Sequence, residues 1–355
     1  MHATLDIETD VSLAPFTTLG LGGRARYFVR VGDVDTLEAA LDWANDRCPA
    51  LVLGGGSNLV IADSGFDGLV LKIELRGLLE TGPGALTVAA GEPWNEVVVY
   101  ATERGWAGIE CLAGIPGCAG ATPIQNVGAY GQEVAQVIEH VEAIDRVTGS
   151  RVTISGADCG FGYRDSRFKR EPGRHLVTAV KFQLRPGGAP TVRYRELVTA
   201  LAEVPAPSLT KVRDEVLRLR RRKSMVLDSS DPDARSVGSF FTNPIVGASA
   251  ATTLVTAAVD AGIVDAPDEV PRWAMDDGRV KFPAAWLIER AGIAKGTVHE
   301  GVGVSSKHTL ALIHRGNGTT AQLVELARSI RDRVRETFGV TLQPEPNLIG
   351  VRLEP

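Results

Sequence analysis

The segment that decides the fold is Ile115-Pro-Gly-Cys-Ala-Gly-Ala-Thr-Pro-Ile-Gln-Asn-Val-Gly-Ala-Tyr-Gly131. Its seventeen residues include four glycines and two prolines among mostly apolar neighbours, which predicts an irregular loop rather than a helix or a strand. Glycine permits positive φ angles and close backbone approach, so the peptide N–H groups of such a loop can point toward a ligand. We therefore expect this segment to cradle phosphate groups.

A second glycine-rich loop has the same character. It is Gly54-Gly-Gly-Ser-Asn58, and it lies between the apolar runs 51–53 and 59–61, which predicts a turn between two short buried strands. Two phosphate-binding loops in one chain indicate a single large ligand that carries a diphosphate.

A dinucleotide-binding fingerprint is present in outline at Gly20-x-Gly22-x-x-Ala25. A Rossmann loop needs a strand before it and a helix after it, because the helix N-terminus holds the pyrophosphate. No strand pattern precedes Gly20, and the following residues 26–31 alternate as a strand does. The sequence therefore does not predict a Rossmann fold.

Composition indicates an ordinary globular protein of two or three domains, with 355 residues and a formal charge of -5 from 38 Lys and Arg against 43 Asp and Glu. This near balance gives no general attraction to nucleic acid or to an anionic membrane. The N-terminus is polar and acidic, and no apolar run has membrane-spanning length. We expect a cytoplasmic protein.

The four cysteines, Cys48, Cys111, Cys118 and Cys159, show neither a CxxC pair nor metal-ligand spacing. This pattern is typical of free thiols in a reducing compartment. No metal site is predicted.

Hydrophobic patterns predict a mixture of helices and strands. The predicted strands are 26–31, 51–53, 59–61, 68–75, 85–90, 140–145, 151–154, 175–184, 309–313 and 340–350. The predicted helices are one opened by the capping box Asp35-Thr-Leu-Glu38, one from Pro93 to Gly105, and 209–223, 249–261, 284–291 and 320–338. The Pro-Gly-Gly-Ala-Pro run 186–190 is the clearest linker.

Several motifs together resemble the MurB family of flavoenzymes, the UDP-N-acetylenolpyruvoylglucosamine reductases of bacterial cell-wall synthesis. They occur in the family's order: Leu53-Gly-Gly-Gly-Ser-Asn58, Ile115-Pro-Gly117, Pro123-Ile-Gln-Asn-Val-Gly128, Gly162-Tyr-Arg-Asp-Ser166, Gly238-Ser-Phe-Phe241, Asn243-Pro244, Ala285-Trp-Leu-Ile288 and Pro344-Glu345. Each motif is weak alone, but the set spans nearly the whole chain. Ala129-Tyr-Gly131 and Tyr194 resemble the longer subtype, in which a tyrosine loop closes over the nucleotide sugar.

The resemblance implies a fold and two cofactors. The fold is an FAD-binding domain like that of vanillyl-alcohol oxidase, at 14–186 with subdomains 14–70 and 71–186. An α+β substrate-binding domain at 191–345 and a tail at 346–355 that packs back would follow. FAD would bind without a covalent link, NADPH would be the reductant, and the protein would be a monomer. The implied FAD-binding residues are Gly54, Gly55, Gly56, Ser57, Asn58, Ile115, Pro116, Gly117, Gly120, Ala121, Gln125, Asn126 and Gly128.

The resemblance also implies a reaction in which NADPH reduces FAD and the flavin passes hydride to an enolpyruvyl ether. Negative charge then develops beside a carboxylate, so the site needs a cation and an acid. Arg164 is expected to hold the carboxylate, because guanidinium is always charged and planar. Ser239 is expected to protonate the carbon, and Glu345 to polarise the intermediate. Pro346 departs from the family pattern, where a β-branched residue is usual.

Tyr130, Tyr163, Tyr194, Lys223 and Asn243 are the implied substrate-binding residues. Structural interpretations stay open for some of the implied site residues. Arg164 could pair with Asp165 on a surface turn, Ser239 could cap a turn, and Lys223 could be the solvated end of a basic helix. His308 stands where some relatives carry glutamine in a strand, and it is left out of the catalytic set.

Two rival functions remain. The first is an FAD-dependent oxidase or dehydrogenase of another substrate on the same fold, whose flavin would reoxidise rapidly in air. The second is a nucleotide-sugar binding protein without turnover. The presence of Arg164, Ser239 and Glu345 argues against the second, because binding alone does not need an acid positioned for a carbon atom.

Overall fold

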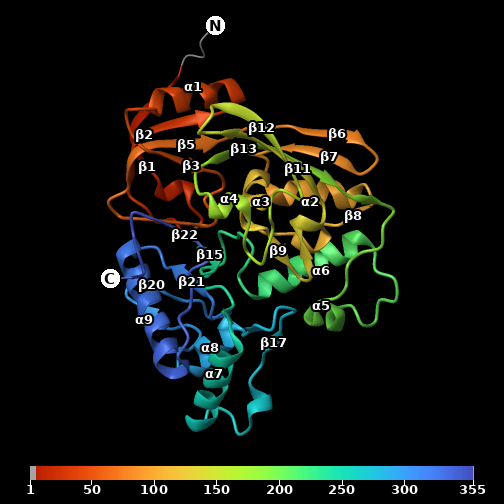
Figure 1. The fold of residues 1–355 in the computed structure, drawn as a ribbon, viewed down its shortest axis with the longest axis vertical. Helices are drawn as coiled ribbons and strands as arrows, with labels where there is room; N and C mark the ends of the chain where they lie inside the picture. Colours follow the sequence, from red (N-terminus) through yellow and green to blue (C-terminus); the bar gives the residue numbers. More distant parts are fainter. Residues whose placement is uncertain (1–4, 355) are drawn as a thin grey trace. The chain divides into compact units, whose positions relative to one another are not determined.

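The computed structural model describes residues 5–354, which form an α+β fold with two compact units (Figure 1). The first unit contains the chain up to Ser12, Arg24–Gly56 and Phe66–Leu227, and the second contains Leu13–Gly23, Ser57–Gly65 and the chain from Asp228. Each unit has its own hydrophobic core.

The first unit contains a four-stranded sheet in the order β1-β2-β5-β3. Its strands are β1 (Glu8–Ser12), β2 (Arg24–Val31), β5 (Phe66–Ile73) and β3 (Ala50–Leu53). The last three are parallel, and β1 runs antiparallel to β2. Helix α1 (Val34–Ala44) connects β2 to β3 and packs on this sheet (Figure 1). A strand therefore follows the Gly20 fingerprint, as the sequence predicted, whereas the strand β1 before it was not predicted.

A five-stranded antiparallel sheet forms the rest of the first unit, in the order β12-β11-β13-β7-β6. Its strands are β12 (Ser150–Ser155), β11 (Ile138–Asp145), β13 (His175–Gln183), β7 (Ala85–Ala89) and β6 (Leu78–Gly82). Two small ribbons pair β9 (Gly128–Ala129) with β10 (Gln132–Glu133) and β8 (Trp106–Ala107) with β14 (Arg185–Pro186). The predicted strands 140–145 and 151–154 are confirmed as β11 and β12, which form an antiparallel hairpin.

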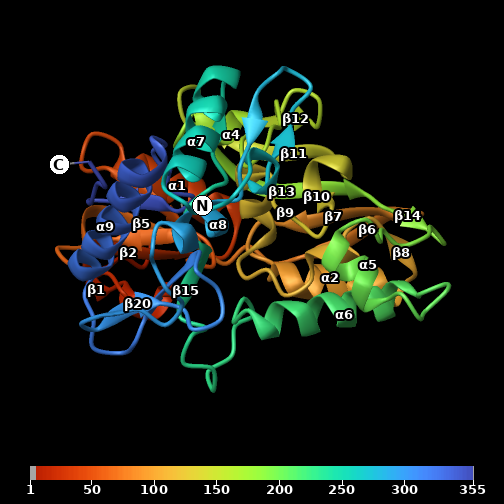
Figure 2. The same ribbon diagram turned by 90° about the horizontal axis from the view of Figure 1, so that it is seen from below.

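The other helices of this unit are α2 (Trp94–Glu103), α3 (Thr122–Gln125), α4 (Arg167–Arg170), α5 (Arg195–Ala200) and α6 (Leu209–Arg222). Helix α6 packs against α2 and α5 (Figure 2).

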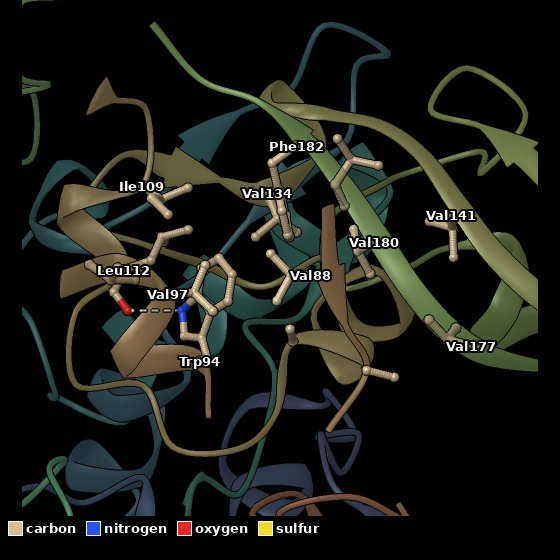
Figure 3. Packing of buried hydrophobic residues seen from close by; sticks show 14 of the residues in the cluster. Val88, Trp94, Val97, Ile109, Leu112, Val134, Val141, Val177, Val180 and Phe182 are labelled. Atoms are coloured by element: carbon tan, nitrogen blue, oxygen red, sulfur yellow. Dashed lines mark hydrogen bonds between the residues drawn. The ribbon is translucent and has the colours of Figure 1, made fainter. Parts of the chain in front are cut away.

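The core of the first unit includes the apolar face of α2. Trp94 is 1% exposed, and its indole Nε1 donates a hydrogen bond of 3.2 Å to the carbonyl of Leu112 (Figure 3). The Trp94 ring also packs against Phe182 of β13, with ring centroids 5.7 Å apart. Helix α2 begins next to the central glycine loop, so the buried Trp94 holds in place the helix start beside which the loop lies.

The second unit has three small sheets. The first small sheet has the order β15 (Ser236–Ser239), β21 (Ala311–His314), β20 (Val302–Val304) and β19 (Val298–His299). The second has the order β16 (Ile245–Val246), β18 (Val280–Lys281) and β17 (Trp273–Ala274). The third is the parallel pair β22 (Asn347–Ile349) and β4 (Leu59–Ile61).

The α-helices of this unit are α7 (Ala248–Asp260), α8 (Ala284–Arg290) and α9 (Thr320–Phe338). Helix α9 packs against α7, α8 and two strands of the first small sheet. A capping box of Thr319 and Gln322 opens α9, and Gly339 closes it with a φ of 70°. The predicted bounds 320–338 are confirmed.

Some predictions about local structure are wrong. The N-cap of α1 is Asp33, whose carboxylate accepts from Thr36 N at 2.7 Å, so Asp35 does not form the predicted capping box. The segment 115–131 is less irregular than predicted, since it contains α3 and β9. In the predicted strand 340–350 only Asn347–Ile349 forms a strand, and β6 has no counterpart in the prediction.

The compact units divide the chain at other places than the domains implied by the resemblance. The first unit continues past the 186–190 linker to Leu227, because β14, α5 and α6 pack with the earlier elements. The assignment of FAD and substrate binding to particular ranges stays a prediction.

Candidate functional site

The two glycine loops touch one another in the first unit. A Cβ atom added at Gly55 would lie 2.7 Å from the Cα of Gly117, well inside van der Waals contact. Gly117 has a φ of 116° and Gly56 a φ of 62°, which side chains rarely adopt. The meeting point is thus lined by backbone, with no room for a side chain at Gly55.

Backbone hydrogen bonds hold the central loop against the turn before α2. Gly117 O accepts from Trp94 N at 3.0 Å, and Gly120 N donates to Ala90 O at 2.9 Å. A Cβ at Gly120 would lie 2.5 Å from the Cβ of Ala90. Gly120 is therefore required for packing, and its N–H is already used within the protein.

A side chain of β5 holds the loop at 54–56 in place. The ammonium of Lys72 in β5 donates to Gly54 O at 2.6 Å, and burial lowers the pKa of Lys72. A backbone-lined cradle of this kind fits the diphosphate of FAD, because peptide dipoles can approach phosphate oxygens closely. Gly56, Ile115, Pro116 and Ala121 belong to the same two loops.

Asn126 has a structural role in the central loop. It is buried, its φ is 44°, and its side-chain Nδ2 donates to Gly162 O at 2.8 Å. Its Oδ1 accepts from Ala135 N at 3.2 Å. The neighbouring Gln125 accepts from Lys169 Nζ at 3.2 Å. These side chains join the glycine loop to the segment that carries Arg164.

Arg164 has a left-handed backbone, with a φ of 53°. Its Nη2 donates to Gly128 O at 2.7 Å, and its guanidinium carbon lies 5.7 Å from the ring centre of Tyr163. Asp165, which could have paired with Arg164, forms an ion pair with Arg170. The structure thus directs the Arg164 side chain to the glycine loop.

Tyr130, Tyr194 and Lys223 come together in the first unit. The two tyrosine rings meet edge to face with centroids 5.3 Å apart, and Lys223 Nζ lies 5.8 Å from the centre of the Tyr130 ring. Lys223 also forms an ion pair with Glu196. Burial raises the pKa of Tyr130 to about 12, so its hydroxyl is neutral and able to donate at physiological pH.

Arg220 is a residue that the sequence analysis missed. It lies one turn before Lys223 on α6, and its Nη2 donates to Met225 O at 2.6 Å. Its Nε is buried and has no hydrogen-bond partner in the described part of the chain. Burial, reinforced by the positive charge of Arg164, lowers the pKa of Arg220 to about 10. It stays charged at neutral pH, so this region has an excess of cationic groups suited to an anion.

The spacing of Arg220 and Lys223 in the sequence was the signal that could have identified Arg220. Residues three apart share one helix face. The run of basic residues at the end of α6 concealed this pair, because the neighbouring Arg221 and Arg222 are exposed.

Ser239 and Glu345 lie close together in the second unit. Ser239 ends β15, directly after Gly238, whose φ is 74°. Glu345 N donates to Phe240 O at 2.8 Å, and Pro344 forms an antiparallel bridge with Phe241. The extended segment around Glu345 is therefore paired with the chain that follows Ser239.

The remaining predicted residues of the second unit are Ser57, Asn58 and Asn243. Asn58 O accepts from Asn347 N at 2.9 Å, which places the end of the 54–58 loop beside the segment of Glu345. Asn243 Oδ1 accepts from Ala284 N at 2.9 Å at the start of α8. The predicted cofactor residues are thus divided between the two compact units.

The four cysteines are free. Burial raises the pKa of Cys111, Cys118 and Cys159, so these thiols are not activated nucleophiles. Among residues 5–354 no group of His, Cys, Asp and Glu side chains has the arrangement of a metal site. In the same range no helix has the length and hydropathy needed to cross a membrane.

Comparisons with protein families match two parts of the chain. Residues 231–349 match a family model described as the C-terminal domain of UDP-N-acetylenolpyruvoylglucosamine reductase, and residues 25–155 match a model of an FAD binding domain.

Similar proteins extend the match to the full length. A UDP-N-acetylenolpyruvoylglucosamine reductase from Salinispora arenicola is 49% identical over 368 residues, covering 99% of each chain. The Streptomyces coelicolor protein of that name is 48% identical, covering 97% of this chain and 90% of its own. The crystal structure of the reductase from Thermus caldophilus has a TM-score of 0.67 at 24% identity and covers 98% of this chain, which shows a common fold.

Proposed function

Because this chain belongs to the UDP-N-acetylenolpyruvoylglucosamine reductase family, we propose that it reduces UDP-N-acetylglucosamine enolpyruvate to UDP-N-acetylmuramate, with NADPH as the reductant. It is an FAD-containing oxidoreductase of peptidoglycan precursor synthesis. The observation that carries this function is the 49% identity to a reductase over 99% of both chains. The match to an FAD binding domain at 25–155 supports the cofactor.

The glycine cradle is the proposed FAD site. Gly55 and Gly117 pack backbone against backbone, and the ammonium of Lys72 binds the carbonyl of Gly54. Bound there, FAD would supply hydride transfer from NADPH to the enolpyruvyl group. The other assigned contacts are those of Gly54, Gly56, Ser57, Asn58, Ile115, Pro116, Gly120, Ala121, Gln125, Asn126 and Gly128.

Arg164 is proposed to bind the carboxylate of the enolpyruvyl group. Guanidinium matches a carboxylate with two parallel hydrogen bonds and stabilises the negative charge that develops beside it. The contact with Gly128 O fixes Nη2 on the glycine-loop side. The ring of Tyr163 flanks the guanidinium.

Ser239 and Glu345 are proposed to act on the carbon next to that carboxylate. The hydroxyl of Ser239 would donate the proton, and Glu345 would polarise the intermediate. Their support is the pairing of the Glu345 segment with Phe240 and Phe241, directly beyond Ser239.

Tyr130, Tyr194 and Lys223 are proposed to bind the diphosphate of the nucleotide sugar, with Asn243 as a further contact. Lys223 and the hydroxyls of Tyr130 and Tyr194 offer one cation and two donors, which suits phosphate oxygens. Arg220, one turn away, adds a second cation.

We also propose an FAD-binding part at 14–186 and a substrate-binding part at 191–345, a monomeric protein, and a cytoplasmic location. Free thiols fit a reducing compartment.

The test is to reduce the purified protein with NADPH under nitrogen and then add UDP-N-acetylglucosamine enolpyruvate. Prompt return of the oxidised flavin spectrum supports the reductase. A protein that stays reduced until air is admitted favours the rival oxidase, and a protein that does not bind FAD refutes the whole assignment.

A further inference from the structure

The short helix α4 follows the Arg164 segment and is tied to it. Ser166 caps this helix by accepting from Lys169 N at 3.2 Å, and its Oγ donates to Ile124 O at 2.7 Å. Lys169 then reaches back, so that its Nζ donates to Arg164 O at 2.9 Å and to Gln125 Oε1 at 3.2 Å. One lysine thus links the backbone of Arg164 to the central glycine loop.

The Arg164 backbone needs such a support. A φ of 53° is unfavourable for a residue with a side chain and persists only where the surroundings determine it. An ammonium bound to the Arg164 carbonyl fixes that peptide group. The guanidinium is fixed separately by Gly128 O, at 2.7 Å.

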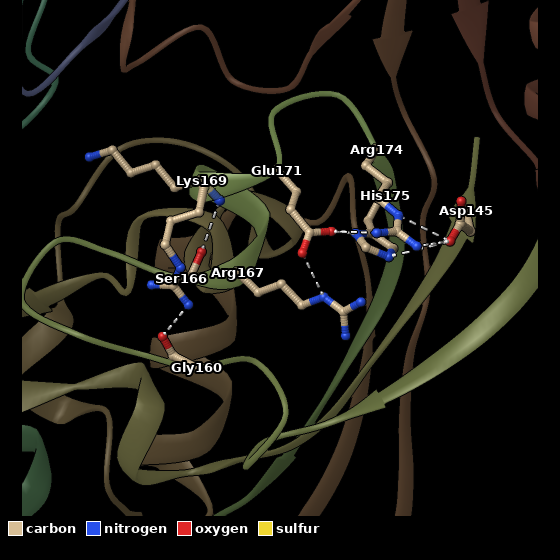
Figure 4. Close-up of polar contacts among 9 residues, drawn as sticks. Asp145, Gly160, Ser166, Arg167, Lys169, Glu171, Arg174 and His175 are labelled. Atoms are coloured by element: carbon tan, nitrogen blue, oxygen red, sulfur yellow. Dashed lines mark hydrogen bonds and ion pairs between the residues drawn. The ribbon is translucent and has the colours of Figure 1, made fainter. Parts of the chain in front are cut away.

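Helix α4 is itself anchored to the five-stranded sheet (Figure 4). Glu171, directly after α4, forms ion pairs with Arg167 and with Arg174 at 3.4 and 3.0 Å. Arg174 also binds Asp145 at the end of β11, at 3.2 Å. His175, at the start of β13, packs edge to face against Phe168. Lys169 therefore extends from a base that the sheet holds in place.

We propose that Lys169 is a positioning residue for Arg164, holding its backbone in the left-handed conformation that directs the guanidinium toward the substrate carboxylate. This inference rests on the role proposed above for Arg164. Lys169 acts through the carbonyl of Arg164 and does not itself contact the reacting atoms. The ammonium of Lys169 has three N–H donors, so it can serve both acceptors, the Arg164 carbonyl and the Gln125 amide oxygen.

The test compares Lys169→Met with two matched variants. Lys169→Arg keeps a cation that can donate to both acceptors. Lys181→Met removes a lysine of β13 whose ion pair with Glu139 is 3.0 Å long, and so controls for the loss of one positive charge in the same unit.

Lys169→Met should slow oxidation of the reduced protein by substrate about 10- to 100-fold, the usual effect of a small misplacement of a binding group. Reduction by NADPH and FAD content should stay within about two-fold of the parent. Lys169→Arg should recover most of the rate, and Lys181→Met should match the parent. In an Arg164→Met background, Lys169→Met should have no further effect, because both changes remove the same interaction.

Crystal structures of the parent and Lys169→Met give a readout that does not depend on turnover. The φ of Arg164 should leave the left-handed region, or its guanidinium should leave Gly128 O. An unchanged Arg164 with an unchanged rate would overturn the proposal, as would equal losses in both half-reactions. If the parent does not react with the substrate, the proposed function fails, and the structures still decide whether Lys169 positions Arg164.

Discussion

Replacing Gly55 by alanine tests the glycine cradle most directly. The new Cβ would lie 2.7 Å from the Cα of Gly117 and 3.2 Å from its carbonyl carbon. Carbon atoms normally stay about 3.5 to 4.0 Å apart, so the two loops must separate by about 1 Å. Both contacting atoms belong to the backbone, and no side-chain rotation can relieve the overlap.

The expected magnitude follows from this overlap. Forcing an extra methyl group into a well-packed region costs about 1 to 3 kcal/mol. If the strain falls on the conformation that binds FAD, the affinity for FAD decreases about 5- to 150-fold. Gly55→Ala should therefore be purified with less flavin than the parent.

The assay is titration of the flavin-depleted protein with FAD, followed by quenching of flavin fluorescence. Gly32→Ala is the matched control, since a Cβ there would meet nothing within 4 Å and Gly32 belongs to the same unit. The control should bind FAD like the parent. Parent-like FAD affinity in Gly55→Ala would show that the loops do not form the cradle.

Three further predictions concern catalysis, anion binding and pH. Ser239→Ala should slow substrate-driven flavin reoxidation about 10²- to 10⁴-fold and leave NADPH reduction intact in stopped-flow experiments; equal losses would refute its role as the acid. Arg220→Met should weaken nucleotide-sugar binding about 10- to 150-fold through loss of a charged hydrogen bond, and an unchanged Kd would exclude this contact. Burial lowers the pKa of His175 from 6.5, so below about pH 6.5 the unfolded chain binds a proton that the folded chain does not. The free energy of unfolding should then fall as the pH decreases, by at most about 1.4 kcal/mol per pH unit. In urea unfolding measured at several pH values, His175→Asn should remove this pH dependence. A variant that keeps the parent's pH dependence would contradict the prediction.

Helix ends were predictable where the signal was local. The predicted bounds of α9 came from its amphipathic pattern and from Gly339, which closes the helix in the left-handed conformation within one turn. The start of α1 was wrong because Asp33 and Asp35 both suit an N-cap, and only the backbone geometry selects Asp33. The four residues of α3 are too few to show a helical period.

Burial that depends on distant segments was not predictable. Arg220 stands in a run of basic residues, and its sequence neighbours resemble a solvated helix end. Its surroundings come from Gly114, whose added Cβ would lie 3.5 Å from Arg220 Nε, and from Tyr130, more than eighty residues earlier in the chain. The motifs around Arg164 and Ser239 identified the family, but not the support that Lys169 gives to Arg164.

Three residues of the proposed site have a strained backbone conformation, and at each of them the side chain makes a contact. Asn126, Tyr130 and Arg164 all have positive φ, at 44°, 48° and 53°. Each such residue costs about 1 to 2 kcal/mol relative to an ordinary conformation. Glycine would remove that cost, yet it would also remove the bond from Asn126 to Gly162, the ring contact of Tyr130 with Tyr194, and the guanidinium of Arg164.

The side chains offset this strain with contacts of their own. Asn126 illustrates the balance, because its buried amide makes hydrogen bonds of 2.8 and 3.2 Å with Gly162 O and Ala135 N. Losing both would leave the part-buried N–H of Ala135 and the part-buried carbonyl of Gly162 without these partners, at about 0.5 to 1.5 kcal/mol each. Since that loss is comparable to the strain relieved, glycine gains nothing at position 126 even though its backbone conformation suits glycine. The same comparison explains why strained residues alternate with glycines in this loop: glycine serves where backbone approaches backbone, and a side chain is kept where it joins two segments.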